Sequence, residues 1–203
     1  MEKVNTSKTE KTNTNGYDSL SDIISKLITL IIKKDQEGIH TLENQTLEIA
    51  VTKDDRDYSS LCIIMYGIRK MQSKAHINTN DAWKKTENNI LNELKDCTFV
   101  LKSDKIEEFR KTIKDVEEEI RQTDKALGHY INQIIDDARI KLASSAYAYG
   151  LSASQASDLF SISKDQLMNF VGVTKMPDED VRFKSIKERV SLLEMSTKAE
   201  SKK

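Results

Sequence analysis

The residue types that could carry out catalysis or bind a metal are few in this chain, and they lie far apart. None of its three histidines, His40, His76 and His129, has a second histidine or a cysteine at the spacing of a zinc site. A di-metal site on helices takes two Glu-x-x-His pairs, and the sequence holds one, from Glu37 to His40. It contains no glycine-rich phosphate loop and no Gly-x-Ser-x-Gly nucleophile elbow. We therefore expect no metal, no cofactor and no enzymatic activity.

Carboxylates and thiols do not change that expectation. The acidic runs at 117–119 and 136–137 are typical of the solvent-exposed face of a helix, and we assign them no chemistry. Cys62 and Cys97 each lie among apolar residues at helical spacing. We expect both to be buried free thiols in a reducing compartment.

Residues 150–172 have a more specific local pattern. Gly150 can adopt a positive φ and end a preceding helix. Ser152 is a suitable N-cap for a short helix through Phe160, and Ser163 for a second helix that ends at Gly172. Small and apolar residues fall where two such helices would touch: Ala156, Ser157, Leu159, Phe160, Ile162, Leu167 and Phe170. This is the spacing of a helix-turn-helix.

The segment also resembles a known family. Its matching residues are Leu151-Ser152, Ala156 or Ser157, Leu159-Phe160 and Ser161-Ile162-Ser163. They resemble the helix-turn-helix of small prokaryotic regulators and antitoxins, which opens with a phrase of the form Leu-Ser-x-x-x-Ala-x-x-Leu-Gly-Ile-Ser. The departure is Ser161, where the family usually has glycine. Residues 127–141 also resemble a stretch of uncharacterised archaeal helical proteins that carry such a C-terminal motif, and this second resemblance implies no activity.

The resemblance implies that exposed residues of the second helix contact bases in the major groove of DNA. By position these residues are Ser163, Lys164, Asp165, Gln166 and Asn169. Glutamine and asparagine can pair with adenine, and lysine with guanine or phosphate. Flanking cations that could hold phosphates are Arg139, Lys141, Lys175, Arg182, Lys184, Lys187 and Arg189. Asp165 would repel phosphate, so a helix-turn-helix used only for packing or protein docking stays open.

The elements that must position this segment are expected to be helices. The 203 residues include one proline and six glycines, too few turn residues for a β-sheet protein. Apolar residues recur every three or four positions over 18–34, 37–51 and 57–74, which predicts three helices. Residues 76–80 are mostly polar and are predicted to form a loop.

Two longer helices are predicted to follow. The first has a stripe of Trp83, Ile90, Leu94, Cys97 and Leu101. Asp104, with Glu107 three residues later, resembles an N-cap with its capping-box partner. The second has a heptad repeat of Ile106, Ile113, Ile120, Leu127 and Ile134. A short connection between two such helices predicts a long antiparallel hairpin, and the heptads fit either packing within the chain or a coiled-coil dimer.

These patterns predict an all-α protein with two folded parts between two tails. We expect a disordered tail at 1–16, a helical region at 17–135, a helix-turn-helix domain at 136–195 and a disordered tail at 196–203. The boundary follows residue 135, where acidic heptads give way to alanine, serine, tyrosine and basic residues. It can fall inside one continuous helix. A last helix of the small domain is expected at about 180–194.

Charge and hydropathy limit the partners. The net charge is −1, so any contact with nucleic acid must come from a local basic patch. No segment approaches the ~20 apolar residues of a membrane span, and we expect a cytoplasmic protein without a membrane partner. The leading interpretation is a transcriptional regulator or antitoxin-like repressor that binds double-stranded DNA, with the helical region supporting a homodimer or a protein partner. The alternative is a helical adaptor that binds proteins and not DNA, which the acidic long helix favours.

Overall fold

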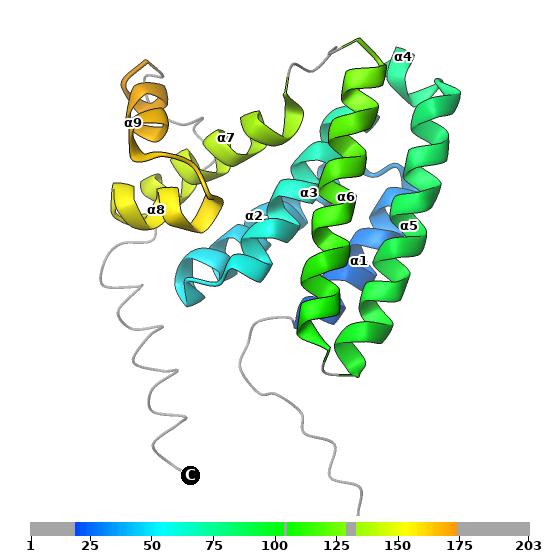
Figure 1. The fold of residues 1–203 in the computed structure, drawn as a ribbon, viewed down its shortest axis with the longest axis horizontal. Helices are drawn as coiled ribbons and strands as arrows, with labels where there is room; N and C mark the ends of the chain where they lie inside the picture. The colour runs from blue at the N-terminus through cyan, green and yellow to red at the C-terminus, as the bar shows by residue number, and fades with distance from the viewer. Residues whose placement is uncertain (1–18, 104, 129–132, 174–203) are drawn as a thin grey trace, which may run out of the picture.

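The structure, a computed structural model, describes residues 19–103, 105–128 and 133–173. The expected all-α class is confirmed, because these residues form helices joined by turns, and none of them lies in a strand (Figure 1). The predicted tails at 1–16 and 196–203 and the predicted helix at 180–194 lie outside the described residues.

The described helices are α1 (Leu20–Lys33), α2 (Gln36–Lys53), α3 (Arg56–Gln72), α4 (Ala75–Asn78), α5 (Asp81–Lys102), α6 (Ile106–Ala126), α7 (Ile134–Ala148), α8 (Ala153–Phe160) and α9 (Lys164–Val173). The first three begin and end close to the bounds that the apolar periodicity predicts. No helix among the described residues combines the length and the apolar character needed to cross a membrane.

Polar caps set the starts of the first three helices. Ser19 and Asp22 form a capping box at the start of α1. The Asp35 carboxylate accepts a hydrogen bond from the Gly38 N–H at 2.8 Å, and Asp55 accepts one from the Asp57 N–H at 2.8 Å. These bonds satisfy backbone donors that have no partner within the helix.

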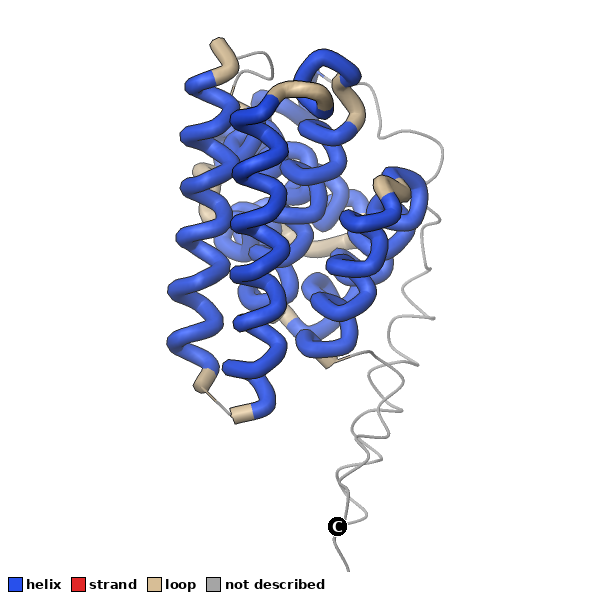
Figure 2. Tube along the Cα trace, turned by 90° about the vertical axis from the view of Figure 1, so that its right-hand side faces the viewer, coloured by secondary structure: helices blue, strands red, loops and turns tan. Residues whose placement is uncertain are grey.

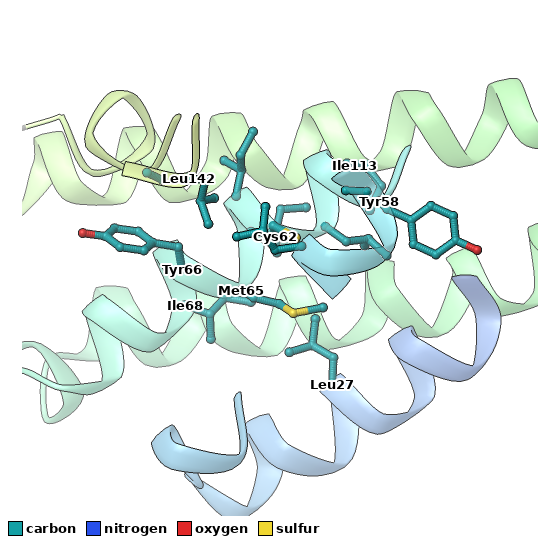
Figure 3. Packing of buried hydrophobic residues seen from close by; sticks show 14 of the residues in the cluster. Leu27, Tyr58, Cys62, Met65, Tyr66, Ile68, Ile113 and Leu142 are labelled. Carbon is teal, nitrogen blue, oxygen red and sulfur yellow. The ribbon is translucent and has the colours of Figure 1, made fainter. Parts of the chain in front are cut away.

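α3 forms the centre of the fold. Its residues from 61 to 68 are all buried, and it contacts α2, α6, α7 and α8. Figure 3 shows side chains from other helices, among them Leu27, Ile113 and Leu142, converging on this helix. A Cβ added at Gly67 would lie 3.3 Å from the Ile120 side chain and 3.6 Å from that of Ile135, so the missing side chain allows α6 and α7 to approach α3 closely.

α5 and α6 lie side by side along most of their lengths and run in opposite directions (Figures 1 and 2). The Thr86 and Thr123 hydroxyls form a buried hydrogen bond of 2.7 Å between them, and Asn89 donates to the Glu119 carboxylate at 2.7 Å. The heptad residues Ile113 and Ile120 are buried within the chain. Packing within the chain therefore accounts for the central part of the heptad pattern.

Three local predictions are wrong. Residues 75–78 form the short helix α4 and not a loop, because Ile77 is buried in the core. The heptads do not run along one helix to Ile134, because α6 ends at Ala126 and Gly128 has a φ of 85°. At the start of α6 the N-cap is Lys105, without a side-chain cap bond. Asp104 lies outside the described residues.

The described parts of the two predicted regions share one core. Ile135 and Leu142 of α7 and Phe160 of α8 belong to the same cluster of buried apolar residues as α1, α2 and α3. α7 contacts α2, α3 and α6 as well as α8 and α9. The boundary after residue 135 stays a prediction.

Candidate functional site

α8 begins and ends where residues 150–161 predict. Gly150 follows α7 with a φ of 97°, and the Ser152 hydroxyl accepts a hydrogen bond from the Gln155 N–H at 3.2 Å. The Gln155 side chain accepts in turn from the Ser152 N–H at 3.1 Å, which completes a capping box. The predicted cap at Ser152 is therefore confirmed.

The turn between α8 and α9 depends on Ser161. This residue has a φ of 54° and a ψ of 47°, the left-handed conformation that ends many helices. The next N–H, that of Ile162, donates to the Ser157 carbonyl at 3.0 Å. A residue with a Cβ pays a conformational cost there that glycine avoids. This is the position at which the resembled family usually has glycine.

We expect Ser161→Gly to raise the free energy of unfolding by about 0.5–1 kcal/mol. The substitution removes the cost of the left-handed conformation, and the higher entropy of glycine in the unfolded chain offsets part of that gain. Urea denaturation of the two proteins measures the difference. A lower stability for the glycine variant would show that the serine hydroxyl stabilises the turn.

A second capping box starts α9. The Ser163 hydroxyl accepts from the Gln166 N–H at 3.1 Å, and the Gln166 side-chain oxygen accepts from the Ser163 N–H at 2.9 Å. The predicted cap at Ser163 is confirmed. The helix continues through Val173, so Gly172 lies inside it and does not end it.

The faces that α8 and α9 turn toward the protein are apolar and close-packed. Ala156, Ser157, Leu159, Phe160 and Leu167 are buried, and Ile162 and Phe170 are half-buried. The Ser59 hydroxyl of α3 donates to the Leu159 carbonyl at 2.9 Å, which attaches α8 to the central helix. α9 contacts both α7 and α8. Its inner face is therefore fixed by the core.

The predicted contact residues of α9 lie on its outer side. Ser163, Lys164, Asp165, Gln166 and Asn169 are all exposed. Met168 is exposed by 42% and is the large apolar residue of this surface. Lys164 is the cation and Asp165 the anion of the described part of α9, so the helix brings no net positive charge to the surface.

The flanking cations are placed differently from one another. Arg139 does not face solvent freely: it donates to the Phe160 carbonyl at 3.1 Å and forms an ion pair with Glu117 of α6. Lys141 donates to the Tyr66 hydroxyl on α3 at 3.0 Å. Both side chains bond to the body of the protein. Lys175, Arg182, Lys184, Lys187 and Arg189 lie outside the described residues.

Two features of the rest of the molecule bear on other kinds of site. Among the described residues no group of three or more histidines, cysteines and carboxylates could hold a metal ion. Cys62 and Cys97 are buried free thiols, as expected, and burial raises the pKa of Cys97 to about 12. Neither thiol is exposed for reaction as a nucleophile.

A shallow depression of about 490 Å³ crosses the outer faces of α5 and α6. It is lined by Asn89, Asn92, Glu93, Asp115, Glu118, Glu119 and Gln122. Burial, together with the neighbouring carboxylates of Glu119 and Asp115, raises the pKa of Glu93. This negative surface would repel a phosphate backbone.

Comparison with known proteins places the chain in no class. No protein-family model, no curated protein and no solved structure matches it.

Proposed function

We propose that α8 and α9 form a helix-turn-helix that binds double-stranded DNA, and that the protein is a transcriptional regulator or an antitoxin-like repressor. The observation that carries this proposal is the division of α9 into two faces. Leu167 is buried on one side, while Lys164, Gln166 and Asn169 are exposed. A recognition helix needs polar side chains exposed along one side and a packed face that holds it in place.

The exposed side chains have distinct roles in this proposal. Lys164, at the start of α9, reaches a phosphate or a guanine, and Asn169 pairs with adenine. The Gln166 oxygen is engaged in the capping box, and its amide nitrogen keeps two donors for a base or a phosphate. Ser163 acts mainly as the cap that fixes the direction of α9.

A homodimer is part of the proposal, because one short helix with a single described cation contacts few phosphates. Two copies on paired half-sites double those contacts. We propose that α5 and α6 act as an antiparallel hairpin whose buried residues Ile113 and Ile120 stabilise the chain itself. The surface between two copies then lies elsewhere than on this part of the heptad repeat.

The experiment is a fluorescence anisotropy titration of duplex DNA from the protein's own upstream region, over a series of salt concentrations. We expect the logarithm of the affinity to fall linearly with the logarithm of the salt concentration. Lys164→Ala with Asn169→Ala should weaken binding by about 10-fold or more, since each base contact contributes about 1–3 kcal/mol. Gln166→Ala is a poor choice here, because it also removes half of a capping box.

Lys85→Ala with Asn88→Ala is the matched control, since both residues are exposed on α5. It removes the same side-chain types far from α9 along the chain and should leave the affinity unchanged. No binding at low salt, or equal binding by both double variants, would contradict the proposal. The helical adaptor that binds proteins and not DNA would then be the function to test.

A further inference from the structure

A group of cations surrounds the ring of Tyr66, on a part of α3 that the proposed DNA contact does not use. Tyr66, Arg69 and Lys70 are spaced by three and four residues, which puts them on one face of the helix. Lys141 approaches the same ring from α7. The Arg69 guanidinium lies 5.3 Å from the ring centroid, and the Lys70 and Lys141 ammonium groups lie 5.4 Å and 5.6 Å from it.

Tyr66 lies at the edge of the hydrophobic core, with these cations around it. Its ring is buried, and its hydroxyl points away from the centre of the hydrophobic cluster (Figure 3). This hydroxyl accepts a hydrogen bond from Lys141 at 3.0 Å. The ring attracts Arg69 and Lys70, and Lys141 lies at the ring edge beside the hydroxyl, so the cations are kept near one another although their charges repel.

The acidic side chains nearby leave part of this charge uncompensated. Arg69 donates two hydrogen bonds of 3.1 Å and 3.3 Å to the carboxyl group of Glu43, whose pKa is raised to about 7. Asp137 lies one turn before Lys141 on α7 and attracts it. None of the ion pairs found among the described residues includes Lys70 or Lys74.

The like charges disfavour the charged form of Lys70. Its pKa is lowered by burial and by the positive charges of Lys141, Arg69 and Lys74. Glu43 and Asp137 attract Lys70 as well, but Glu43 also interacts with Arg69 and Asp137 with Lys141, so four cations face two acidic side chains. Such an arrangement raises the free energy of the folded protein unless an anion binds beside it.

We propose that Lys70, Lys74 and Lys141 bind a phosphoryl oxyanion beside Tyr66. Lys70 and Lys74 each carry three hydrogen-bond donors, and Lys141 keeps two beside its bond to Tyr66, which suits an anion with several oxygens on different sides. The anion can be a free phosphate compound or a phosphate of a nucleic-acid backbone. The site shares no residue with α9. A result against DNA binding by α9 would therefore not be a result against anion binding at Tyr66.

Thermal unfolding in sodium pyrophosphate, against sodium chloride of equal ionic strength, tests this site. We expect pyrophosphate at ten times its Kd to raise the Tm of the unmodified protein by about 3–6 °C. Lys70→Met with Lys141→Met should reduce this shift to below about 1 °C, because methionine keeps the length of the side chain without its charge. The exposed pair Lys95→Met with Lys102→Met on α5 is the control and should keep the full shift.

A second readout separates binding from folding. In chloride alone, Lys70→Met by itself should unfold at or above the temperature of the unmodified protein, because it relieves the repulsion from Lys141, Arg69 and Lys74 and keeps the Lys141 bond to Tyr66. If the double variant folds poorly, Lys74→Met serves instead, since this exposed residue makes none of the contacts with Tyr66. No shift for the unmodified protein, or equal shifts for the site variants and the control, would overturn the proposal.

The duplex DNA titration distinguishes the two sources of the phosphoryl group. If Lys70→Met with Lys141→Met removes the pyrophosphate shift and also weakens DNA binding several-fold, the site binds a nucleic-acid backbone. If the shift is removed and DNA affinity is unchanged, the site binds a smaller phosphate compound. If pyrophosphate does not stabilise the protein, neither source applies.

Discussion

Replacing Arg139 with methionine should lower the free energy of unfolding by about 3–5 kcal/mol. Arg139 makes an ion pair with Glu117, and both side chains are largely shielded from solvent. The same guanidinium donates to the carbonyl of Phe160, the last residue of α8. The substitution leaves a buried carboxylate without its main counter-ion and a carbonyl at the end of α8 without its donor. Urea denaturation of the two proteins at the same pH measures the loss.

The double variant Arg139→Met/Glu117→Met is the control for this prediction. It replaces the ion pair by two apolar side chains of similar length and should recover more than half of the loss. DNA affinity per folded molecule should change little, since Arg139 bonds to the protein and does not extend from it. A loss of stability below about 1 kcal/mol together with weaker DNA binding would indicate that Arg139 contacts a DNA phosphate.

Between pH 5 and pH 8 the unmodified protein should lose about 2–3 kcal/mol of stability through Glu43. Burial is the largest influence on this carboxyl group and raises its pKa from 4.5 to about 7, against the opposing effects of Arg69 and Lys70. The unfolded chain releases this proton near pH 4.5, and the folded protein holds it up to about pH 7. The contribution is therefore full below pH 4.5 and is lost as the pH rises through 7.

Glu43→Gln isolates this contribution, because the amide does not titrate. The difference in unfolding free energy between the unmodified protein and the variant should fall as the pH rises from 5 to 8. Taking this difference cancels the contributions of Glu93, Glu117 and Asp137, whose pKa values are also raised by burial. A difference that grows with pH would show that the ion pair with Arg69 outweighs the cost of burying the charge.

The fold class could be predicted because most helices here are amphipathic. The apolar spacing in α1, α3 and α5 follows from the side of each helix that the core covers, and Ile24, Ile64 and Leu94 are all buried as expected. Caps could be predicted for a similar reason, since Ser152 and Ser163 act within their own first turn. Information of this kind is local to the sequence.

The errors fall where distant contacts decide the structure. Ile134 continues the heptad spacing of α6, but it belongs to α7, beyond a break at which Gly128 and Gln133 have positive φ values. The short helix α4 has too few residues to show a periodic pattern, and burial of Ile77 stabilises it. The residues around the break after α6 and those of α4 carry no sequence pattern strong enough to predict either feature.

The candidate site also combines features that the local sequence predicts with features that distant contacts decide. The exposed positions of α9 could be predicted from the helical pattern, whereas the partners of Arg139 and Lys141 could not. Their bonds to Phe160 and Tyr66 join residues that lie 21 and 75 positions apart in the sequence. The cation group at Tyr66 was missed for this reason, although the spacing of Tyr66, Arg69 and Lys70 gave part of the signal.

The most direct test of the proposed function is the DNA affinity of Gln166→Glu at low salt. Glutamate is a favoured residue at this position of a capping box, so α9 should keep its start while its outer face gains a negative charge. Gln45→Glu, at an exposed position of α2, is the matched control. We predict that Gln166→Glu weakens binding by about 10-fold or more and that Gln45→Glu leaves it nearly unchanged. Equal affinities for both variants and the unmodified protein would contradict the claim that α9 faces DNA.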